Sequence, residues 1–309
     1  LEYDIAVLTN ITQDHLDLHK TMKDYVNTKL RLFKWLITFE RKPWIKKTAV
    51  INVWSEYSEL FIWETYDSMY LYGTWNGSSL SASNKRIENN ITKFEVKLPW
   101  KIATIETKLK WDFNIENILA SIWVFMAFGI SWDDIIEVIK KIDGVPGRME
   151  LVKNDLNADI IVDYAHTPDA LEKVLTTLQA IWYKKIVTVF WATWDRDKTK
   201  RPIMWEIVAK YSDIVILTQD DDYSENSENI IKDVLPWINR VEWDNFFIIP
   251  TRKEAIELGI SSIEEWDVLL VAGKWDEHVM VTNAWAIEWH DKTVIKEILK
   301  NIDDNKIIV

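Results

Sequence analysis

Acidic and imidazole side chains gather directly after the first strand-like run of this sequence. Asp14, His15, Asp17 and His19 fall within six positions that follow the apolar run 4–9. Carboxylate oxygens and imidazole nitrogens are suitable ligands for a divalent cation, which makes this cluster a candidate metal site. A solvated loop that caps the next helix would explain the same residues, and both interpretations stay open from this cluster alone.

A second polar cluster, DYAHTPD, occupies residues 163–169, between another strand-like run and a helix. An Asp at a strand tip often binds ribose hydroxyls, and the N-terminus of the following helix favours anions. Thr167 and Pro168 also fit an ordinary N-cap and first helical residue. The two interpretations are compatible, because a cap and a nucleotide contact use different atoms.

A third cluster, WATWDRDKTKRP, covers residues 191–202 and follows the apolar run 185–190. Its basic side chains suit the recognition of phosphate or carboxylate groups, although a solvated run of charges has the same composition. Trp191 and Trp194 are unexpected here, since a chain that turns tightly toward a ligand after a buried strand requires glycine.

Two α/β domains are expected to position these clusters. In the first half we predict strands at 4–9 and 48–53, a helix at 21–34, short alternating strands between 56 and 108, and helices near 114–128 and 133–142. Val145-Pro146-Gly147 fits a hinge, and beyond it strands alternate with helices. This rhythm predicts a parallel, Rossmann-like sheet whose ligands bind at the carboxyl ends of the strands. The predicted strands are 159–165, 185–190, 213–218, 246–250 and 267–273, with helices from 168, from about 202, near 227–235, from 252 and at 291–300.

Composition and charge narrow the class of protein. The chain has 309 residues, of which 48% are hydrophobic and 28% charged, and its formal charge is −12. This acidic balance argues against nucleic acid as the main partner, because phosphate binding needs a basic face. There is no apolar run of about 18 residues, the first residues lack the pattern of a signal peptide, and cysteine is absent. We therefore expect a cytoplasmic protein without membrane insertion, disulfides or thiolate metal sites.

Two residue counts do not fit an ordinary protein. The chain has 7 glycines and 19 tryptophans, whereas glycine usually makes up roughly 7% of residues and tryptophan is rare. The combined fraction of glycine and tryptophan in this sequence is close to the combined fraction that the two residue types usually have. Many positions written Trp therefore look like positions of glycine.

Six longer stretches carry motifs that run through nearly the whole chain. They are TNITQDHLDLHKTMKDYVNTKLRLF (9–33), DFNIENILAS (112–121), VPGRMELV (145–152), DYAHTPDALEKVL (163–175), DRDKTKRPIM (195–204) and AGKWDEH (272–278). In these stretches, and in their order, the sequence resembles the Mur ligases, and among them the MurE type. The resemblance implies that residues 1–145 are the distal part of a central ATP-binding domain, and residues 146–309 a Rossmann-like C-terminal domain.

The resemblance implies an ATP-dependent ligase that forms an amide bond. Such an enzyme would add a third amino acid, a diamino acid, to UDP-N-acetylmuramoyl-L-alanyl-D-glutamate through an acyl phosphate, in the synthesis of peptidoglycan precursors. The implied cofactors are ATP and Mg²⁺, the partners are the UDP-muramoyl-dipeptide and a free amino acid, and a monomer is expected. The alternatives are another ligase of the superfamily, of the folylpolyglutamate or cyanophycin type, and a non-catalytic nucleotide-binding relative.

Three residues take catalytic positions in this resemblance. Lys29 occupies the position of the family's carbamylated lysine and, together with His15, would bind the second Mg²⁺. A surface lysine on a helix is the ordinary alternative for Lys29. His166 is expected close to the γ-phosphate of ATP.

Five further residues match positions that bind the nucleotide in the family. Asn114 and Asn117 fall where the family contacts adenine. Arg148 and Asp163 fall where it holds the phosphates and the ribose of ATP, and Thr167 is expected near the γ-phosphate. Taken alone, Asn117 could be a helix-face residue and Arg148 a linker salt bridge.

The pocket for the incoming amino acid departs from the family pattern. Arg196, Gly273 and Glu277 match positions that line it in the diaminopimelate-adding enzymes, where Glu277 would bind the distal ammonium and Arg196 a carboxylate. The signature Asp-Asn-Pro-Arg is replaced by DDDY at 220–223, which includes Asp221 as a candidate substrate-binding residue. The missing arginine puts diaminopimelate in doubt, and an acidic pocket would suit lysine or another diamino acid.

A second departure concerns the start of the ATP-binding domain. The sequence contains neither the Gly-rich loop that ends Gly-Lys-Thr/Ser in the family nor the glutamate that binds both metals. The family places both before the segment with which this sequence begins. We therefore expect a fragment that does not catalyse the reaction by itself, whereas its parent protein does.

The resemblance also bears on the tryptophan count. The family has glycine where this sequence has Trp191, Trp194, Trp205 and Trp275, and commonly where it has Trp100 and Trp111, whereas an aromatic residue is expected only at Trp289. Our hypothesis is that most of the positions written as tryptophan are encoded by UGA, and that the source translates this codon as glycine. Real indoles in so many turns would overpack the fold and force forbidden backbone angles.

Overall fold

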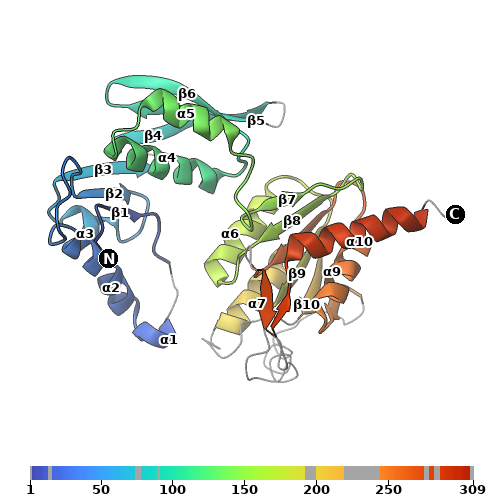
Figure 1. Ribbon diagram of the computed structural model, residues 1–309. Coiled ribbons are helices and arrows are strands. Elements are labelled where there is room, and N and C mark those ends of the chain that lie inside the picture. The colour runs from blue at the N-terminus through green and yellow to red at the C-terminus, as the bar shows by residue number, and fades with distance from the viewer. Residues whose placement is uncertain are drawn as a thin grey trace. The chain divides into compact units, whose positions relative to one another are not determined.

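The computed structural model describes residues 2–12, 16–73, 78–88, 91–191, 200–218, 244–274, 278–281 and 286–306 (Figure 1). The chain divides into two compact units, Leu1–Gly144 and Val145–Val309, and each is described by itself. Among the described residues no helix has the length and apolar character needed to cross a membrane.

A six-stranded sheet forms the centre of the first unit. Its strands are β1 (Ile5–Leu8), β2 (Thr48–Asn52), β3 (Ser68–Gly73), β4 (Leu80–Glu88), β5 (Ile91–Leu98) and β6 (Lys101–Thr107), in that order across the sheet. Neighbours from β1 to β4 are parallel, whereas β4, β5 and β6 form an antiparallel meander. The short strands predicted between 56 and 108 are therefore present as β3 to β6.

Helices cover both faces of this sheet. They are α1 (Leu16–His19), α2 (Met22–Leu36), α3 (Ser58–Ile62), α4 (Asp112–Ala127) and α5 (Trp132–Lys141). Successive residues of β2 separate the two cores, because alternate side chains of a strand point to opposite faces. Ala49 and Ile51 pack with α2 and α3, whereas Val50 packs with α4 and α5. Both helices predicted after residue 108 are confirmed within a few residues.

The second unit contains the alternating strands and helices that the sequence predicts. Its sheet has the order β11-β10-β9-β12-β8-β7, and β8 to β12 run parallel. The strands are β7 (Glu150–Val152), β8 (Asp159–Asp163), β9 (Ile186–Trp191), β10 (Ile214–Thr218), β11 (Phe246–Ile248) and β12 (Val268–Ala272). A separate hairpin pairs β13 (Val279–Val281) with β14 (Ala286–Glu288). The expected all-parallel sheet is wrong at one edge, where β7 pairs antiparallel with β8.

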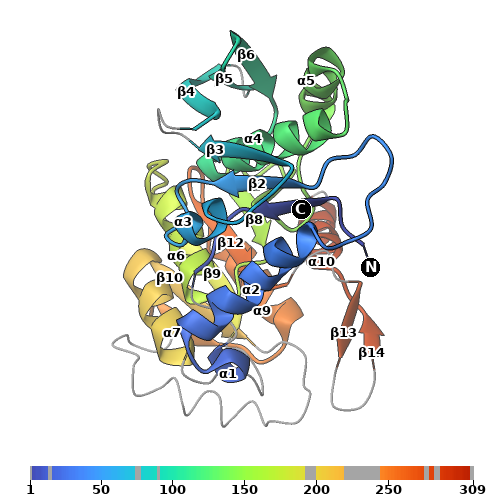
Figure 2. The ribbon, with the colours of Figure 1, turned by 90° about the vertical axis from the view of Figure 1, so that its left-hand side faces the viewer.

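Helices lie on both faces of this second sheet, as in doubly wound folds. Figure 1 shows α6 (Pro168–Gln179) and α7 (Lys200–Tyr211) on one face, and α9 (Arg252–Ser261) and α10 (Asp291–Lys306) on the other. The view in Figure 2 shows β8, β12, β9 and β10 as neighbouring strands. Leu269 and Val271 of the central strand β12 pack against α9 and α10 in one buried core. The helix predicted near 227–235 lies outside the described residues.

Candidate functional site

The carboxyl ends of three neighbouring strands bring candidate residues together in the second unit. Asp163 ends β8, and Ala272, its partner in the register, ends β12. Gly273 follows directly, and its N–H donates to the carbonyl of Asp163 at 2.9 Å. Trp191 ends β9 on the other side of β12. This edge is where ligands bind in open α/β sheets.

The carboxylate of Asp163 is buried and held by the backbone. Its Oδ2 accepts the N–H of Met149 at 2.6 Å, and its Oδ1 accepts the N–H of Ala165 at 2.7 Å. Burial raises the pKa of the Asp163 carboxyl above its usual value, and the two donors and nearby Arg148 offset only part of that effect. Each carboxylate oxygen keeps a further lone pair, so Asp163 can still accept a hydrogen bond from a bound hydroxyl.

Three side chains contact one another beside this carboxylate. The guanidinium carbon of Arg148 lies 4.9 Å from the ring centroid of Tyr164, and the Tyr164 and His166 rings are 4.2 Å apart. Arg148 is exposed, so its charge is accessible to a ligand. Nδ1 of His166 lies 2.9 Å from the carbonyl oxygen of Tyr164. Because a carbonyl only accepts, Nδ1 is the donor, which leaves Nε2 of a neutral ring as an acceptor.

Thr167 begins helix α6 as an N-cap. Its hydroxyl accepts the N–H of Ala170 at 3.4 Å, its backbone is extended, and Pro168 occupies the first turn. The capping interpretation of this segment is therefore confirmed. The role of Thr167 near a phosphate stays a prediction, although the cap does place the N-terminus of α6 directly after Asp163 and His166.

A buried ion pair holds the end of β12, and no sequence pattern predicts it. Nε and Nη2 of Arg252 donate to Oδ1 and Oδ2 of Asp291 at 2.8 and 2.6 Å. Nη2 also donates to the carbonyl of Ala272 at 3.2 Å, and the indole of Trp289 donates to Asp291 Oδ1 at 2.8 Å. The pair joins the starts of α9 and α10 to the residue before Gly273, so it positions the edge that carries the candidate site.

In the first unit, Lys29 and two asparagines lie on separate helices. Lys29 is exposed on α2, with Nζ 5.3 Å from the ring centroid of Tyr25. Asn114 is buried at the start of α4, where its amide donates to the carbonyl of Lys110 at 2.8 Å. Asn117 is exposed, and its amide lies 3.4 Å from Oδ1 of Asn114. Asn117 can therefore contact a ligand, whereas Asn114 orients it.

The carboxyl edge of the first sheet carries a polar pair that the sequence did not single out. The buried side-chain amide of Asn52, which ends β2, donates to the carbonyl of Thr9 at 3.0 Å and to Oε2 of Glu116 at 3.1 Å. Glu116 lies on α4 between the two asparagines. These bonds connect the segment after β1, the end of β2 and α4. The residues are far apart in the sequence, so no local sequence pattern predicts the contacts.

Four candidate residues lie outside the described part of the chain. They are His15, Arg196, Asp221 and Glu277. Within the part that is described, no group of three or more His, Asp and Glu side chains could hold a metal ion. The metal role of His15 and Lys29 and the amino-acid pocket therefore stay predictions.

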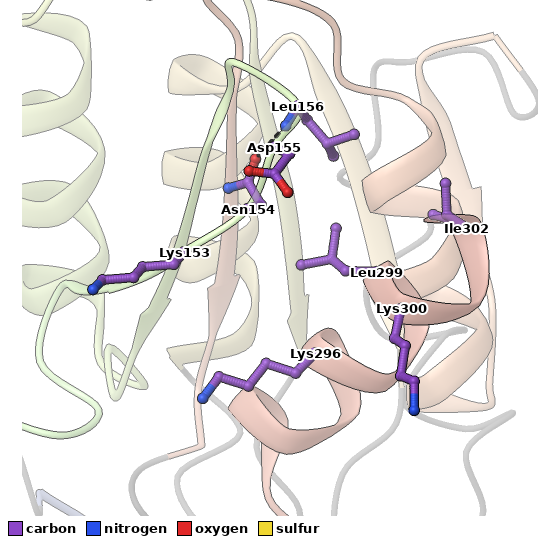
Figure 3. A pocket seen from close by; sticks show the side chains of 8 residues that line it. All are labelled: Lys153, Asn154, Asp155, Leu156, Lys296, Leu299, Lys300 and Ile302. Atoms are coloured by element: carbon purple, nitrogen blue, oxygen red, sulfur yellow. Dashed lines mark hydrogen bonds between the residues drawn. The ribbon is translucent and has the colours of Figure 1, made fainter. Parts of the chain in front are cut away.

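A surface pocket of about 250 Å³ lies elsewhere on the second unit (Figure 3). It is formed by the segment between β7 and β8, at the amino end of β8, and by residues 296–302 of α10. Its lining includes Lys153, Lys296 and Lys300, whose side chains point in different directions in Figure 3. The side-chain amide of Asn154 donates hydrogen bonds to the carbonyls of Val152 and Ala158, so it is engaged within the same part of the chain. The pocket is therefore separate from the candidate site and has no convergent polar groups.

Comparison with known proteins gives matches over nearly the whole chain. The model of the Mur ligase middle domain matches residues 1–125, and that of the Mur ligase glutamate ligase domain matches residues 147–275. UDP-N-acetylmuramoyl-L-alanyl-D-glutamate--2,6-diaminopimelate ligase 1 of Clostridium acetobutylicum is 34% identical over 302 residues, covering 97% of this chain and 60% of the relative. The ligase of Geobacillus kaustophilus named for the same reaction is 37% identical over 301 residues, covering 97% and 61%.

Solved structures agree with these matches. A structure of a UDP-N-acetylmuramoyl-L-alanyl-D-glutamate--2,6-diaminopimelate ligase has a TM-score of 0.59 at 27% identity, covering 97% of this chain and 60% of that one. The MurF ligase of Thermotoga maritima in complex with ADP has a TM-score of 0.69 at 18% identity, covering 99% and 63%, which shows a shared fold. This chain thus spans about 60% of the length of the curated relatives it matches.

Proposed function

Because the chain belongs to the Mur ligase family, we propose that the protein is an ATP-dependent ligase that adds a diamino acid to UDP-N-acetylmuramoyl-L-alanyl-D-glutamate. The observation that carries this proposal is the identity of 34% and 37% to two enzymes named for adding 2,6-diaminopimelate, over 97% of this chain. The geometry supports it, because Arg148, Asp163, His166 and Gly273 gather at one ligand-binding sheet edge.

The described residues of this edge fit a nucleotide. ATP supplies the phosphoryl group that activates the substrate carboxylate. Arg148, exposed and stacked on Tyr164, would pair with phosphate oxygens through its planar guanidinium. Asp163 would accept a ribose hydroxyl with its remaining lone pairs. Its two backbone hydrogen bonds hold the carboxylate in place before the ligand arrives, which lowers the entropic cost of binding.

His166 and Thr167 would act next to the transferred phosphate. Nδ1 of His166 donates to the carbonyl of Tyr164 and so fixes the orientation of the ring, and its Nε2 would contact a phosphate oxygen. Thr167 fixes the start of α6, whose first N–H groups and helix dipole favour negative charge. Asn117, exposed on α4, would contact adenine, and Asn114 would orient it.

We propose Mg²⁺ as the metal, held in part by His15 and Lys29. The metal neutralises charge on the phosphates when it is bound. Lys29 is exposed, so carbon dioxide can reach its amine, and carbamylation would turn a cation into a carboxylate that binds a metal. Arg196, Asp221, Gly273 and Glu277 would form the pocket for the incoming diamino acid, whose ammonium groups suit acidic partners. We propose further that the protein acts as a monomer in the cytoplasm.

The test is an assay of the protein expressed from the gene that encodes this chain. It would receive ATP, Mg²⁺ and the UDP-muramoyl-dipeptide, with diaminopimelate or lysine, and the tripeptide product would be detected by mass. Product with one of the two diamino acids supports the proposal, and its loss in an Arg148→Ala variant supports the site. Product with neither, from a protein that hydrolyses or binds ATP, would overturn the proposed substrate.

A further inference from the structure

Tryptophan occupies an unusual share of the left-handed backbone positions in this protein. Among the described residues, eight other than glycine have a positive φ, and four of them are tryptophans: Trp44 (φ 70°), Trp111 (φ 76°), Trp182 (φ 66°) and Trp266 (φ 72°). Tryptophan makes up only 19 of the 309 residues. Side chains with a Cβ are disfavoured in this region, and glycine is the residue that adopts it without strain. The backbone at these four positions therefore has a conformation that is typical of glycine and unusual for tryptophan.

Trp111 has the most demanding backbone of the four. It is the N-cap of α4, with φ 76° and ψ 143°, and its side chain makes no capping hydrogen bond. At this φ, a ψ so far from the left-handed helical value approaches a region that is essentially restricted to glycine. An N-cap is also a position where glycine is accepted in place of a polar cap.

Trp182 stands where helices commonly end on glycine. It follows the last turn of α6, its N–H donates to the carbonyl of Gln179, and its φ is positive. Glycine is the usual residue in the left-handed position after a helix, because it adopts this conformation without steric cost. The Trp182 side chain is 92% exposed, and that of Trp44 is 100% exposed. Neither indole gains packing that would offset the backbone strain.

Two further tryptophans place a buried indole N–H where the described residues offer no acceptor. Trp191 ends β9 against Gly273, where a Cβ would come within 1.8 Å of the indole nitrogen. Trp205 is fully buried in α7, between Phe190 and Phe246, whose ring centroids lie 5.7 and 5.0 Å away. Both indole nitrogens are buried and have no hydrogen-bond partner in the described part of the chain. A buried donor without an acceptor is costly, and glycine would remove it.

Two other tryptophans have ordinary environments. The indole of Trp289 donates to Asp291 at 2.8 Å. Trp123 is buried, stacks on Tyr70 with ring centroids 4.3 Å apart, and donates to the carbonyl of Leu71 at 3.3 Å. Neither residue has a positive φ. The described tryptophans therefore include a group that the fold accommodates and a group that it does not.

We infer that six positions, Trp44, Trp111, Trp182, Trp191, Trp205 and Trp266, are glycine in the protein that its source makes, and that Trp289 is tryptophan. A source that reads UGA as glycine and UGG as tryptophan produces this division when its gene is translated with a code in which both codons mean tryptophan. This inference also changes the candidate site at the carboxyl ends of β9 and β12. Glycine at position 191 removes the indole that lies against Gly273 and leaves that space open to a ligand at the ends of β9 and β12.

The first test is the mass of tryptic peptides of the protein isolated from its source. The peptide 174–184, VLTTLQAIWYK, contains Trp182 as its one tryptophan, whereas 186–196, IVTVFWATWDR, contains both Trp191 and Trp194. The first peptide should weigh as if position 182 were glycine. Fragmentation of the second should locate glycine at position 191, and fragmentation of 275–292 should locate an indole at position 289. Tryptophan at 182 and 191 would overturn the inference. None of these masses depends on ligase activity, so the inference and the proposed function fail independently.

The second test replaces residues in the printed chain. Trp182→Gly should raise the Tm by roughly 2–4 °C, the shift expected when strain of about one kcal/mol is relieved in a unit of this size. The matched control, Trp289→Gly, removes a half-buried, hydrogen-bonded indole and should lower the Tm. A lower Tm for Trp182→Gly, equal to that of the control, would contradict the inference from the backbone.

Discussion

The buried pair Arg252–Asp291 gives the sharpest prediction for the second unit. The two side chains are 0% and 1% exposed, so Asp291→Ala leaves a guanidinium in the core without its bidentate partner. Removing one partner of a buried pair costs about 3–5 kcal/mol, because the remaining charge stays desolvated. The free energy of unfolding should fall by that amount, and the Tm by roughly 6–20 °C.

Two variants make the reasoning testable. Arg252→Met combined with Asp291→Leu removes both charges and fills the space, so its stability should stay within about 1–2 kcal/mol of the parent or exceed it. Glu137→Gln breaks the exposed pair with Lys141, whose side chains are 66% and 69% exposed, and should cost less than about 0.5 kcal/mol.

Urea unfolding followed by circular dichroism measures these free energies, and hydrogen exchange of the β12 amides (Val268–Ala272) reports on the unit concerned. We expect Asp291→Ala to lose protection at Ala272, whose carbonyl Arg252 holds. The reasoning is refuted if Asp291→Ala costs no more than Glu137→Gln. It is refuted equally if the double variant is as unstable as the single one.

Three further predictions concern the candidate site. Burial raises the pKa of Asp163, so the folded state binds the carboxyl proton more tightly than the unfolded chain does, and the resulting stabilisation is complete below the unfolded pKa and is lost as the pH rises through the folded pKa. In urea titrations the parent should therefore gain stability on acidification relative to Asp163→Asn. A difference between the two proteins that does not depend on pH would contradict this. Thr167→Ala should lower the free energy of unfolding by about 1 kcal/mol through loss of the N-cap, with Thr28→Ala, on the exposed face of α2, as the control. In the parent protein, Lys29→Ala should reduce ligase turnover by roughly a hundredfold or more without changing the Tm, since the side chain is exposed. Unchanged turnover would exclude Lys29 from the mechanism.

Buried parallel strands were predictable because their sequences are nearly continuous apolar runs. β8, β9, β10 and β12 each begin and end within two residues of the predicted range. β7 was missed because it has three residues and lies at an edge, so it has neither a long run nor a two-residue alternation that a pattern can detect. The hairpin of β13 and β14 was missed for the same reason.

The candidate site was predictable in its residues but not in its contacts. Asp163 follows a strand and precedes a helix, which is enough to place it at a carboxyl edge. The bond from Met149 to Asp163 depends on a left-handed backbone at Met149 (φ 46°), which no sequence pattern at that position indicates. Arg252 and Asp291 are far apart in the sequence, so only the folded chain shows that they pair.

The segment that joins the two units is tied to the carboxylate of Asp163. Val145 and Arg148 form an isolated bridge, the carbonyl of Gly147 accepts the N–H of Tyr164 at 2.9 Å, and Met149 donates to Asp163. Mechanical tension applied along the connection reaches these bonds before it reaches the core of the sheet. A pulling experiment across residue 145 would therefore break the hydrogen bonds beside Asp163 first. A ligand that binds Asp163 would raise the force needed to break them.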